Sequence, residues 1–187
     1  MKVTLSREEM LKYRRLLGGL EPLRQDCSIE QTDGIDVDAL LEAHLRRWYL
    51  QLLDSAPRHL LAPENIAATV TTTHVGEGYA DGIRLTMPAM CRRVFDVQLK
   101  GWHHAVEVQA PSECERIISL QQNRFTAASI SHPVAVLLPG ESGGKAPQVL
   151  AFPGTGGSAA QVSVVTAVLD QGNKVYTFDE RALETIP

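Results

Sequence analysis

Four residues in the middle of the chain have side chains suited to metal binding or nucleophilic chemistry. They are two cysteines and two adjacent histidines, Cys91, Cys114, His103 and His104. A small metal- or thiol-dependent enzyme could use thiolate and imidazole groups of this kind. The spacing argues against it, because adjacent residues of a strand point to opposite faces and no CxxC or HxxxH pattern is present. We therefore expect no catalytic residue, cofactor or metal ion, and keep such an enzyme as an alternative.

Two glycine-rich segments, 140–144 and 153–158, raise the question of phosphate binding. A phosphate-binding loop of the GxxxxGK[ST] type needs its lysine, a preceding strand and a following helix. The second segment lacks the lysine, and the residues that follow it have the character of a strand. Both segments are therefore predicted to be loops that join strands.

Charged residues suggest a different role, the electrostatic docking of one protein surface on another. The sequence contains three arginine pairs, Arg14–Arg15, Arg46–Arg47 and Arg92–Arg93. Residues 25–42 carry six acidic side chains and no basic one. Each arginine pair alone is typical of a solvated surface, whereas the docking alternative places it on an acidic partner or on the acidic stretch of a neighbouring copy. Under that alternative the interface candidates are Arg46, Arg47, Arg92, Arg93, Asp33 and Asp36.

The composition excludes several classes of protein. The chain of 187 residues is 44% apolar and 21% charged, which is typical of a globular protein with a core. A net charge of −4 and an aromatic content of 5% disfavour a nucleic-acid binder that stacks bases. Three cysteines without a CxxC pair indicate reduced thiols in a protein that is not secreted. No stretch approaches the roughly 18 apolar residues of a membrane span, so no membrane partner is expected.

The first third of the chain is predicted to be helical. Ser6 and Glu9 form a capping-box pattern that starts a helix over 6–17. A second helix over 38–54 carries an apolar stripe made of Leu41, Leu45, Trp48 and Leu52. Residues 20–37 between the two helices are predicted to be an acidic loop.

The rest of the chain is predicted to be rich in strands. Apolar and polar residues alternate most clearly from Phe95 to Leu99, as in a half-buried strand. The predicted fold class is α+β, an N-terminal helical bundle followed by a mostly antiparallel β-sheet or β-barrel-like part. We expect a helical part over 1–64 and a β-rich part over 65–187, together one compact domain.

One stretch of the sequence resembles a known family through the order and spacing of several short segments. These segments are Ile83–Pro88, Arg93–Trp102, Pro111–Arg116, Gln122–Thr126, His132–Val136 and Val149–Phe152. The pattern is similar to the head-to-tail adaptor (connector or ring) proteins of tailed phages, in particular those of short-tailed phages and prophages of gut Bacteroidales. The resemblance covers roughly residues 38–152, and the glycine-rich segments have no counterpart in the pattern.

The resemblance implies a structural role in the virion. Copies would form a ring below the portal, extend the DNA channel without sequence-specific binding and dock the tail, after assembly in the host cytoplasm. The implied partners are the portal protein, other connector or tail proteins and further copies of the chain. Matching positions are expected to be structural or interface residues, namely Trp102, Arg124, Phe125 and Pro133. Arg124 would hold a backbone or carboxylate partner, and Trp102 would pack the sheet edge against the helices. A bacterial protein-interaction module outside any phage is a further alternative.

Overall fold

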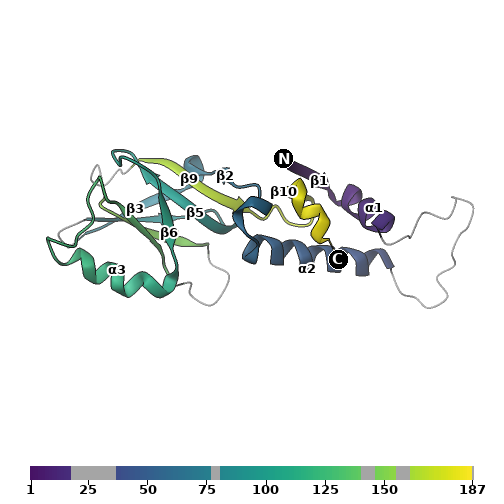
Figure 1. Cartoon of the computed structure of the whole chain (residues 1–187), viewed down its shortest axis with the longest axis horizontal. Coiled ribbons are helices and arrows are strands. Elements are labelled where there is room, and N and C mark those ends of the chain that lie inside the picture. The colour runs from purple at the N-terminus through teal and green to yellow at the C-terminus, as the bar shows by residue number, and fades with distance from the viewer. Residues whose placement is uncertain (18–36, 77–80, 140–145, 155–160, 187) are drawn as a thin grey trace, which may run out of the picture. The chain divides into compact units, whose positions relative to one another are not determined.

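The chain divides into two compact units (Figure 1). The computed structural model describes residues 1–17, 37–76, 81–139, 146–154 and 161–186. We call Met1–Ala62 with Asp170–Pro187 the terminal unit, and Pro63–Leu169 the central unit. The chain therefore leaves the terminal unit once and returns to it.

The terminal unit combines helices with a two-stranded sheet. Its elements are β1 (Lys2–Ser6), α1 (Arg7–Leu17), α2 (Val37–Ser55), β10 (Val175–Asp179) and the short 3-10 helices Arg58–Leu60 and Glu180–Thr185. β1 and β10 pair antiparallel, from Lys2 opposite Asp179 to Ser6 opposite Val175. Residues from the two ends of the sequence thus form one sheet.

The start of α1 confirms the predicted capping box. The backbone N–H of Glu9 donates to Ser6 Oγ at 3.3 Å, and the N–H of Ser6 donates to a Glu9 carboxylate oxygen at 2.7 Å. These reciprocal bonds satisfy two donors that the first turn of a helix leaves without an intrahelical partner. Hydrogen bonding to Ser6 also lowers the pKa of Glu9, because it favours the ionised carboxylate.

The expected N-terminal helical bundle is wrong. The predicted apolar stripe of α2 is indeed buried, and Leu45, Trp48 and Leu52 are at most 9% exposed. The stripe packs on β10, where the rings of Trp48 and Phe178 meet edge to face with centroids 5.6 Å apart. A strand from the far end of the sequence therefore supplies the cover that we had expected from further helices.

The central unit is built on one eight-stranded sheet with the order β2-β9-β5-β6-β7-β8-β4-β3. All pairs are antiparallel except β6 with β7, which run parallel. The strands are β2 (Glu64–Asn65), β3 (Thr71–Val75), β4 (Gly82–Thr86), β5 (Cys91–Leu99), β6 (Val106–Gln109), β7 (Val134–Leu137), β8 (Gln148–Phe152) and β9 (Val162–Leu169). The one longer helix described in this unit is α3 (Cys114–Gln121), and 3-10 turns lie at Ala67–Thr69 and Pro111–Glu113.

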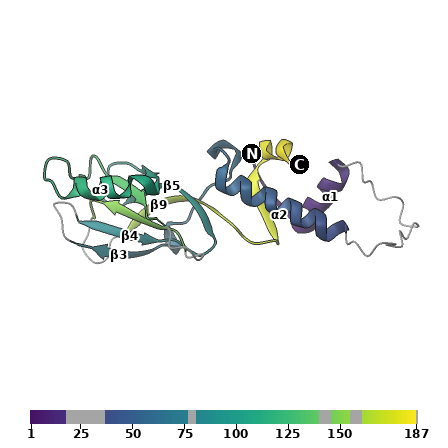
Figure 2. The ribbon, with the colours of Figure 1, turned by 90° about the horizontal axis from the view of Figure 1, so that it is seen from below.

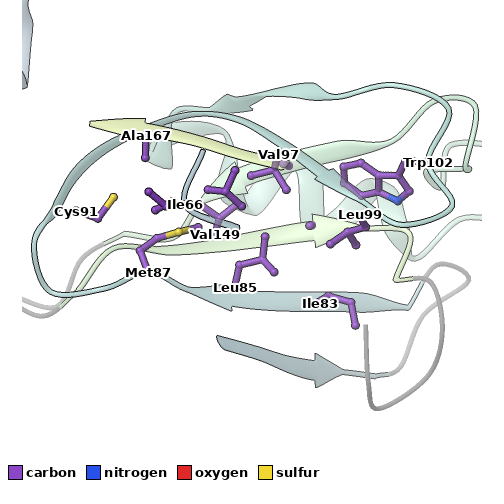
Figure 3. Packing of buried hydrophobic residues seen from close by; sticks show 13 residues of the cluster. Ile66, Ile83, Leu85, Met87, Cys91, Val97, Leu99, Trp102, Val149 and Ala167 are labelled. Carbon is purple, nitrogen blue, oxygen red and sulfur yellow. The ribbon is translucent and has the colours of Figure 1, made fainter. Parts of the chain in front are cut away.

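The sheet curls around its own core (Figure 3). The helix α3 covers part of the opposite face (Figure 2). The inner cluster joins side chains from both halves of the sheet, such as Leu85, Val97 and Val165, which are all fully buried. On the other face, Ile117 of α3 packs with Leu150 of β8. The protein is therefore a mixed α+β fold with a curled sheet. In the described part of the chain, no helix has the length and apolar character needed to cross a membrane.

Candidate functional site

The two described cysteines lie in separate clusters. Cys91 belongs to the inner core of the curled sheet, and Cys114, the first residue of α3, belongs to the cluster on the opposite face. Burial raises the pKa of Cys91 to about 11 and also raises the pKa of Cys114, because a thiolate is poorly solvated there. Both side chains are therefore protonated thiols at neutral pH, a form that is a weak nucleophile and a weak metal ligand.

The two histidines also fail to meet the cysteines. His103 is exposed, and its Nδ1 lies 3.4 Å from the hydroxyl oxygen of Ser131. His104 is exposed and lines a hollow of about 580 Å³ between α3 and β6. Among the residues with described positions, no group of three or more His, Cys, Asp or Glu side chains could hold a metal ion. Cys91, Cys114, His103 and His104 thus do not form one site.

Several other predicted residues fall outside the described ranges or inside the core. Asp33, Asp36 and most of both glycine-rich segments lie outside the described residues. Trp102 is 4% exposed within the inner core of the sheet, and its indole N–H donates to the carbonyl of Pro153 at 2.9 Å. Pro133 is buried directly before β7. Trp102 therefore packs among strands in the inner core, and not between the sheet edge and the helices as the resemblance implied.

The segment Gln122–Thr126 forms a tight turn that presents Phe125 to solvent. The Phe125 side chain is 93% exposed, although its own N–H is held by the Asn123 side-chain oxygen at 3.0 Å. Thr126 Oγ1 donates to the carbonyl of Leu120 at 2.8 Å and ties the turn to the end of α3. Arg124 in the same turn is exposed and makes no ion pair with another described residue. The turn is thus anchored by polar contacts, while its largest apolar side chain points outward.

The three arginine pairs have different environments. Arg46 makes a two-pronged ion pair with Asp170, at 2.7 and 2.5 Å, and donates to the carbonyl of Gly172 at 3.2 Å. Arg15 pairs with Asp38, which joins α1 to α2. Arg47 is exposed on α2. Arg46 and Arg15 are therefore used inside the terminal unit.

Arg92 and Arg93 line a hollow of about 430 Å³ that opens between β5 and β6. The two strands pair only at Asp96 with Glu107 and at Val97 with Val106. A bulge in β5 near Phe95 interrupts its pairing with β9, and a bulge bends a strand locally. β6 continues instead beside β7, so β5 and β6 diverge. We call this hollow the arginine groove, and its lining is Arg92, Arg93, Val94, Glu107, Val108, Gln109, Ala110, Leu137 and Pro147.

Comparison with known proteins assigns no family or fold relative to this chain. No family model, curated protein or solved structure matches the chain. Among the described residues, two features of the central unit stand out as candidates for a function, the outward-pointing Phe125 and the arginine groove. Sequence reasoning named Phe125, Arg92 and Arg93, but it missed both hollows. Pro133 is a sequence signal for the hollow between α3 and β6 alone, because it lines that hollow and has no N–H to extend the pairing of β6 with β7.

Proposed function

We propose that this protein is a structural assembly subunit, a head-to-tail connector that forms a ring below the portal of a tailed phage. The ring extends the DNA channel and docks the tail, and its partners are the portal protein, other connector or tail proteins and further copies of the chain. DNA passes through without sequence-specific contacts, and the subunit resides in the virion after assembly in the host cytoplasm. No step in this role requires a catalytic group.

Phe125 is the observation that carries the proposal. A phenyl ring that is 93% exposed gains the full benefit of burial only when a partner covers it. The turn that presents it is held by hydrogen bonds from Phe125 N–H and Thr126 Oγ1, so little further ordering is needed on binding. Ile118 and Ile130, at 38% and 45% exposed, belong to the same helix-and-loop segment. Aromatic anchors of this kind dominate the energetics of protein interfaces.

The segments that resemble connector proteins lie in the same unit as Phe125, which supports a role for that unit in assembly. These segments, between Ile83 and Phe152, all lie in the central unit, where they form β4, β5, α3, β7 and β8. The Gln122–Thr126 segment of the resemblance is the turn that presents Phe125. A family-like pattern and an outward-pointing aromatic side chain thus coincide in one compact unit.

The test is assembly with a portal ring, measured for a Phe125→Ala variant and for a matched control. Met90→Ala is the control, because Met90 is a large apolar residue that is 50% exposed elsewhere in the central unit. The protein is mixed with a purified phage portal protein, chosen from the neighbourhood of its gene where one is encoded there, and ring formation is followed by mass photometry and electron microscopy. We expect rings with the native chain, and an affinity about thirtyfold weaker for Phe125→Ala, the loss typical of an interface anchor.

Two results would contradict the proposal. A native chain that stays monomeric with the portal at high concentration is not a connector. If Phe125→Ala and Met90→Ala assemble equally well, Phe125 is not the anchor and the proposal loses the observation that carries it. Binding to a bacterial protein, with no portal gene nearby, would favour an interaction module outside a phage.

A further inference from the structure

We propose that two copies of this chain pair through a two-fold contact, in which each copy places its Phe125 ring in a hollow of the other. The hollow is the one of about 580 Å³ between α3 and β6, and we call it the α3 hollow. The inference rests on the proposed role of Phe125 as an interface anchor. It names a second copy as the partner that covers this ring in the free protein.

The fold keeps Phe125 out of the hollow of its own copy. The ring is 93% exposed, although the next residue, Thr126, lines the α3 hollow. Asn123 Oδ1 accepts from the N–H of Phe125 at 3.0 Å, and the carbonyl of Leu120 accepts from Thr126 Oγ1 at 2.8 Å. These bonds fix the turn on both sides of the ring. The ring therefore stands beside the hollow, and only another molecule can fill the hollow with such a group.

The α3 hollow has the room and the lining for a phenyl ring. An apolar cavity of about 150 Å³ is enough to hold benzene, so this larger hollow also accepts part of a neighbouring side chain. Its apolar lining is Ile117, Leu120, Pro133 and Val134. Leu120 and Val134 are only half-buried in the single chain, so an entering ring removes further apolar surface from water.

The charges beside the ring and in the hollow are opposite. Arg124 directly precedes Phe125 and is exposed. The lining of the hollow contains one arginine, Arg116, which Glu113 already holds at 2.6 Å. Its one acidic residue, Glu107, is exposed and makes no salt bridge with another described residue. A ring that enters the hollow thus brings a guanidinium to a carboxylate, a pair that forms strong hydrogen bonds.

The ring and the hollow lie next to each other, which favours a symmetric pair. Phe125 is followed by Thr126, which lines the hollow, so both features share one side of the molecule. When the ring of one copy enters the hollow of a second, a two-fold axis brings the second ring to the first hollow. Such a contact closes at two copies. Two rings bury only about 300–500 Å², less than a stable complex needs, so we expect a pair that separates on dilution.

Sedimentation velocity of the full-length chain over about a hundredfold range of concentration tests the pairing. We expect the native chain to pass from monomer to dimer and to grow no further. Phe125→Ala is expected to raise the dissociation constant at least about thirtyfold, because each copy loses its anchor. Met90→Ala is the matched control and leaves the dissociation constant unchanged, since Met90 is 50% exposed elsewhere in the central unit.

A charge exchange tests which surfaces meet. One full-length variant carries Arg124→Glu and the other carries Glu107→Arg, and each alone is expected to stay monomeric because like charges meet twice in a symmetric pair. An equimolar mixture is expected to dimerise, because a mixed pair contains one native contact and one contact with both charges exchanged. Arg47→Glu, at an exposed arginine of the terminal unit, is the control and dimerises as the native chain does. Thermal melts verify that every variant is folded.

The outcomes separate this inference from the proposed function. The inference is overturned if the native chain stays monomeric, if Phe125→Ala pairs as tightly as Met90→Ala, or if the mixture of charge variants stays monomeric. Growth of the native chain alone beyond two copies also overturns it, because a two-fold contact ends at a dimer. If the pair forms as expected but no ring forms with a portal, the inference stands and the connector proposal falls.

Discussion

Arg46 and Arg47 are neighbours in sequence, yet their environments give them different roles. The side chains of Arg46 and its partner Asp170 are only 20% and 14% exposed, and the guanidinium uses two N–H groups on the carboxylate. Removal of Arg46 takes the guanidinium away from a half-buried carboxylate, although the N–H of Gly172 still donates to Asp170 at 3.0 Å. Arg47 follows on α2 and is exposed to solvent, where a charged side chain changes the free energy of unfolding little.

We predict that Arg46→Ala destabilises the protein and that Arg47→Ala does not. The expected loss for Arg46→Ala is about 2 kcal/mol of unfolding free energy, from the charge-assisted bonds that Arg46 makes to the half-buried Asp170 carboxylate. Arg47→Ala is expected to stay within about 0.5 kcal/mol of the native chain. Urea unfolding followed by the fluorescence of Trp48 and Trp102 measures both. Equal stability of the two variants would mean that Arg46 is also surface charge.

At the scale of elements, the two-stranded sheet depends on α2 for one of its edges. β10 pairs with β1 on one side, and on the other side the Tyr49 hydroxyl accepts from the N–H of Thr177 at 3.1 Å and donates to its carbonyl at 3.3 Å. Isolated two-stranded sheets are marginally stable in water. Packing of Tyr49 on Tyr176, with ring centroids 5.0 Å apart, covers the same strand. The helix thus stabilises the sheet through both a polar and an apolar contact.

Removal of the Tyr49 hydroxyl tests this contact with little change in shape. Tyr49→Phe is predicted to cost about 1–3 kcal/mol, because it leaves the partly buried N–H and C=O of Thr177 without their side-chain partner. Tyr13→Phe is the control, since Tyr13 is half-buried on α1 and makes no hydrogen bond through its hydroxyl to another described residue. Urea unfolding of both variants gives the two free energies. A Tyr49→Phe protein as stable as the control would show that the sheet needs no support from the hydroxyl.

Local elements were predictable from the sequence, but their partners were not. The capping box of Ser6 and Glu9 and the apolar stripe of α2 depend on residues a few positions apart, so a sequence pattern reveals them. The pairing of β1 with β10 joins Lys2 to Asp179, and no local pattern encodes a contact over that separation. The helical bundle was predicted from the two helices expected over 6–17 and 38–54, and an apolar stripe on a helix does not say whether another helix or a strand covers it.

The residues of the candidate site were also predictable from the sequence, but their surroundings were not. Arg92, Arg93 and Phe125 stand out in the sequence by type, but only the structure shows which of them faces a hollow or solvent. The arginine groove arises where a bulge near Phe95 and the turn of β6 toward β7 separate two strands. Alternation from Phe95 to Leu99 predicted the strand, and it gave no sign of the bulge, because one extra residue barely alters a short pattern.

At the scale of the whole molecule, the two units differ in how the chain builds them. The central unit is continuous, and both of its clusters and all eight strands of its sheet lie between Pro63 and Leu169. The terminal unit needs two separate pieces of chain, since the aromatic residues of β10 cover α2. Cutting the chain after Ala62 and after Leu169 should therefore leave the central unit complete, but it divides the terminal unit into two pieces.

We predict that a fragment of residues 63–169 folds alone and that a fragment of residues 1–62 does not. The first fragment keeps every strand pair of its sheet and every residue of its two clusters, so heat or urea should unfold it in one cooperative step. The second loses β10, and with it the ring contacts of Trp48 and Tyr49 and the partner strand of β1. Circular dichroism and amide-proton NMR dispersion report the state of each fragment. Addition of a peptide of residues 170–187 to the fragment 1–62 is expected to restore dispersed signals, because it returns the missing strand and the Asp170 partner of Arg46. A fragment 1–62 that is folded without the peptide would instead show that α1, α2 and β1 form a core of their own, as the expected helical bundle requires.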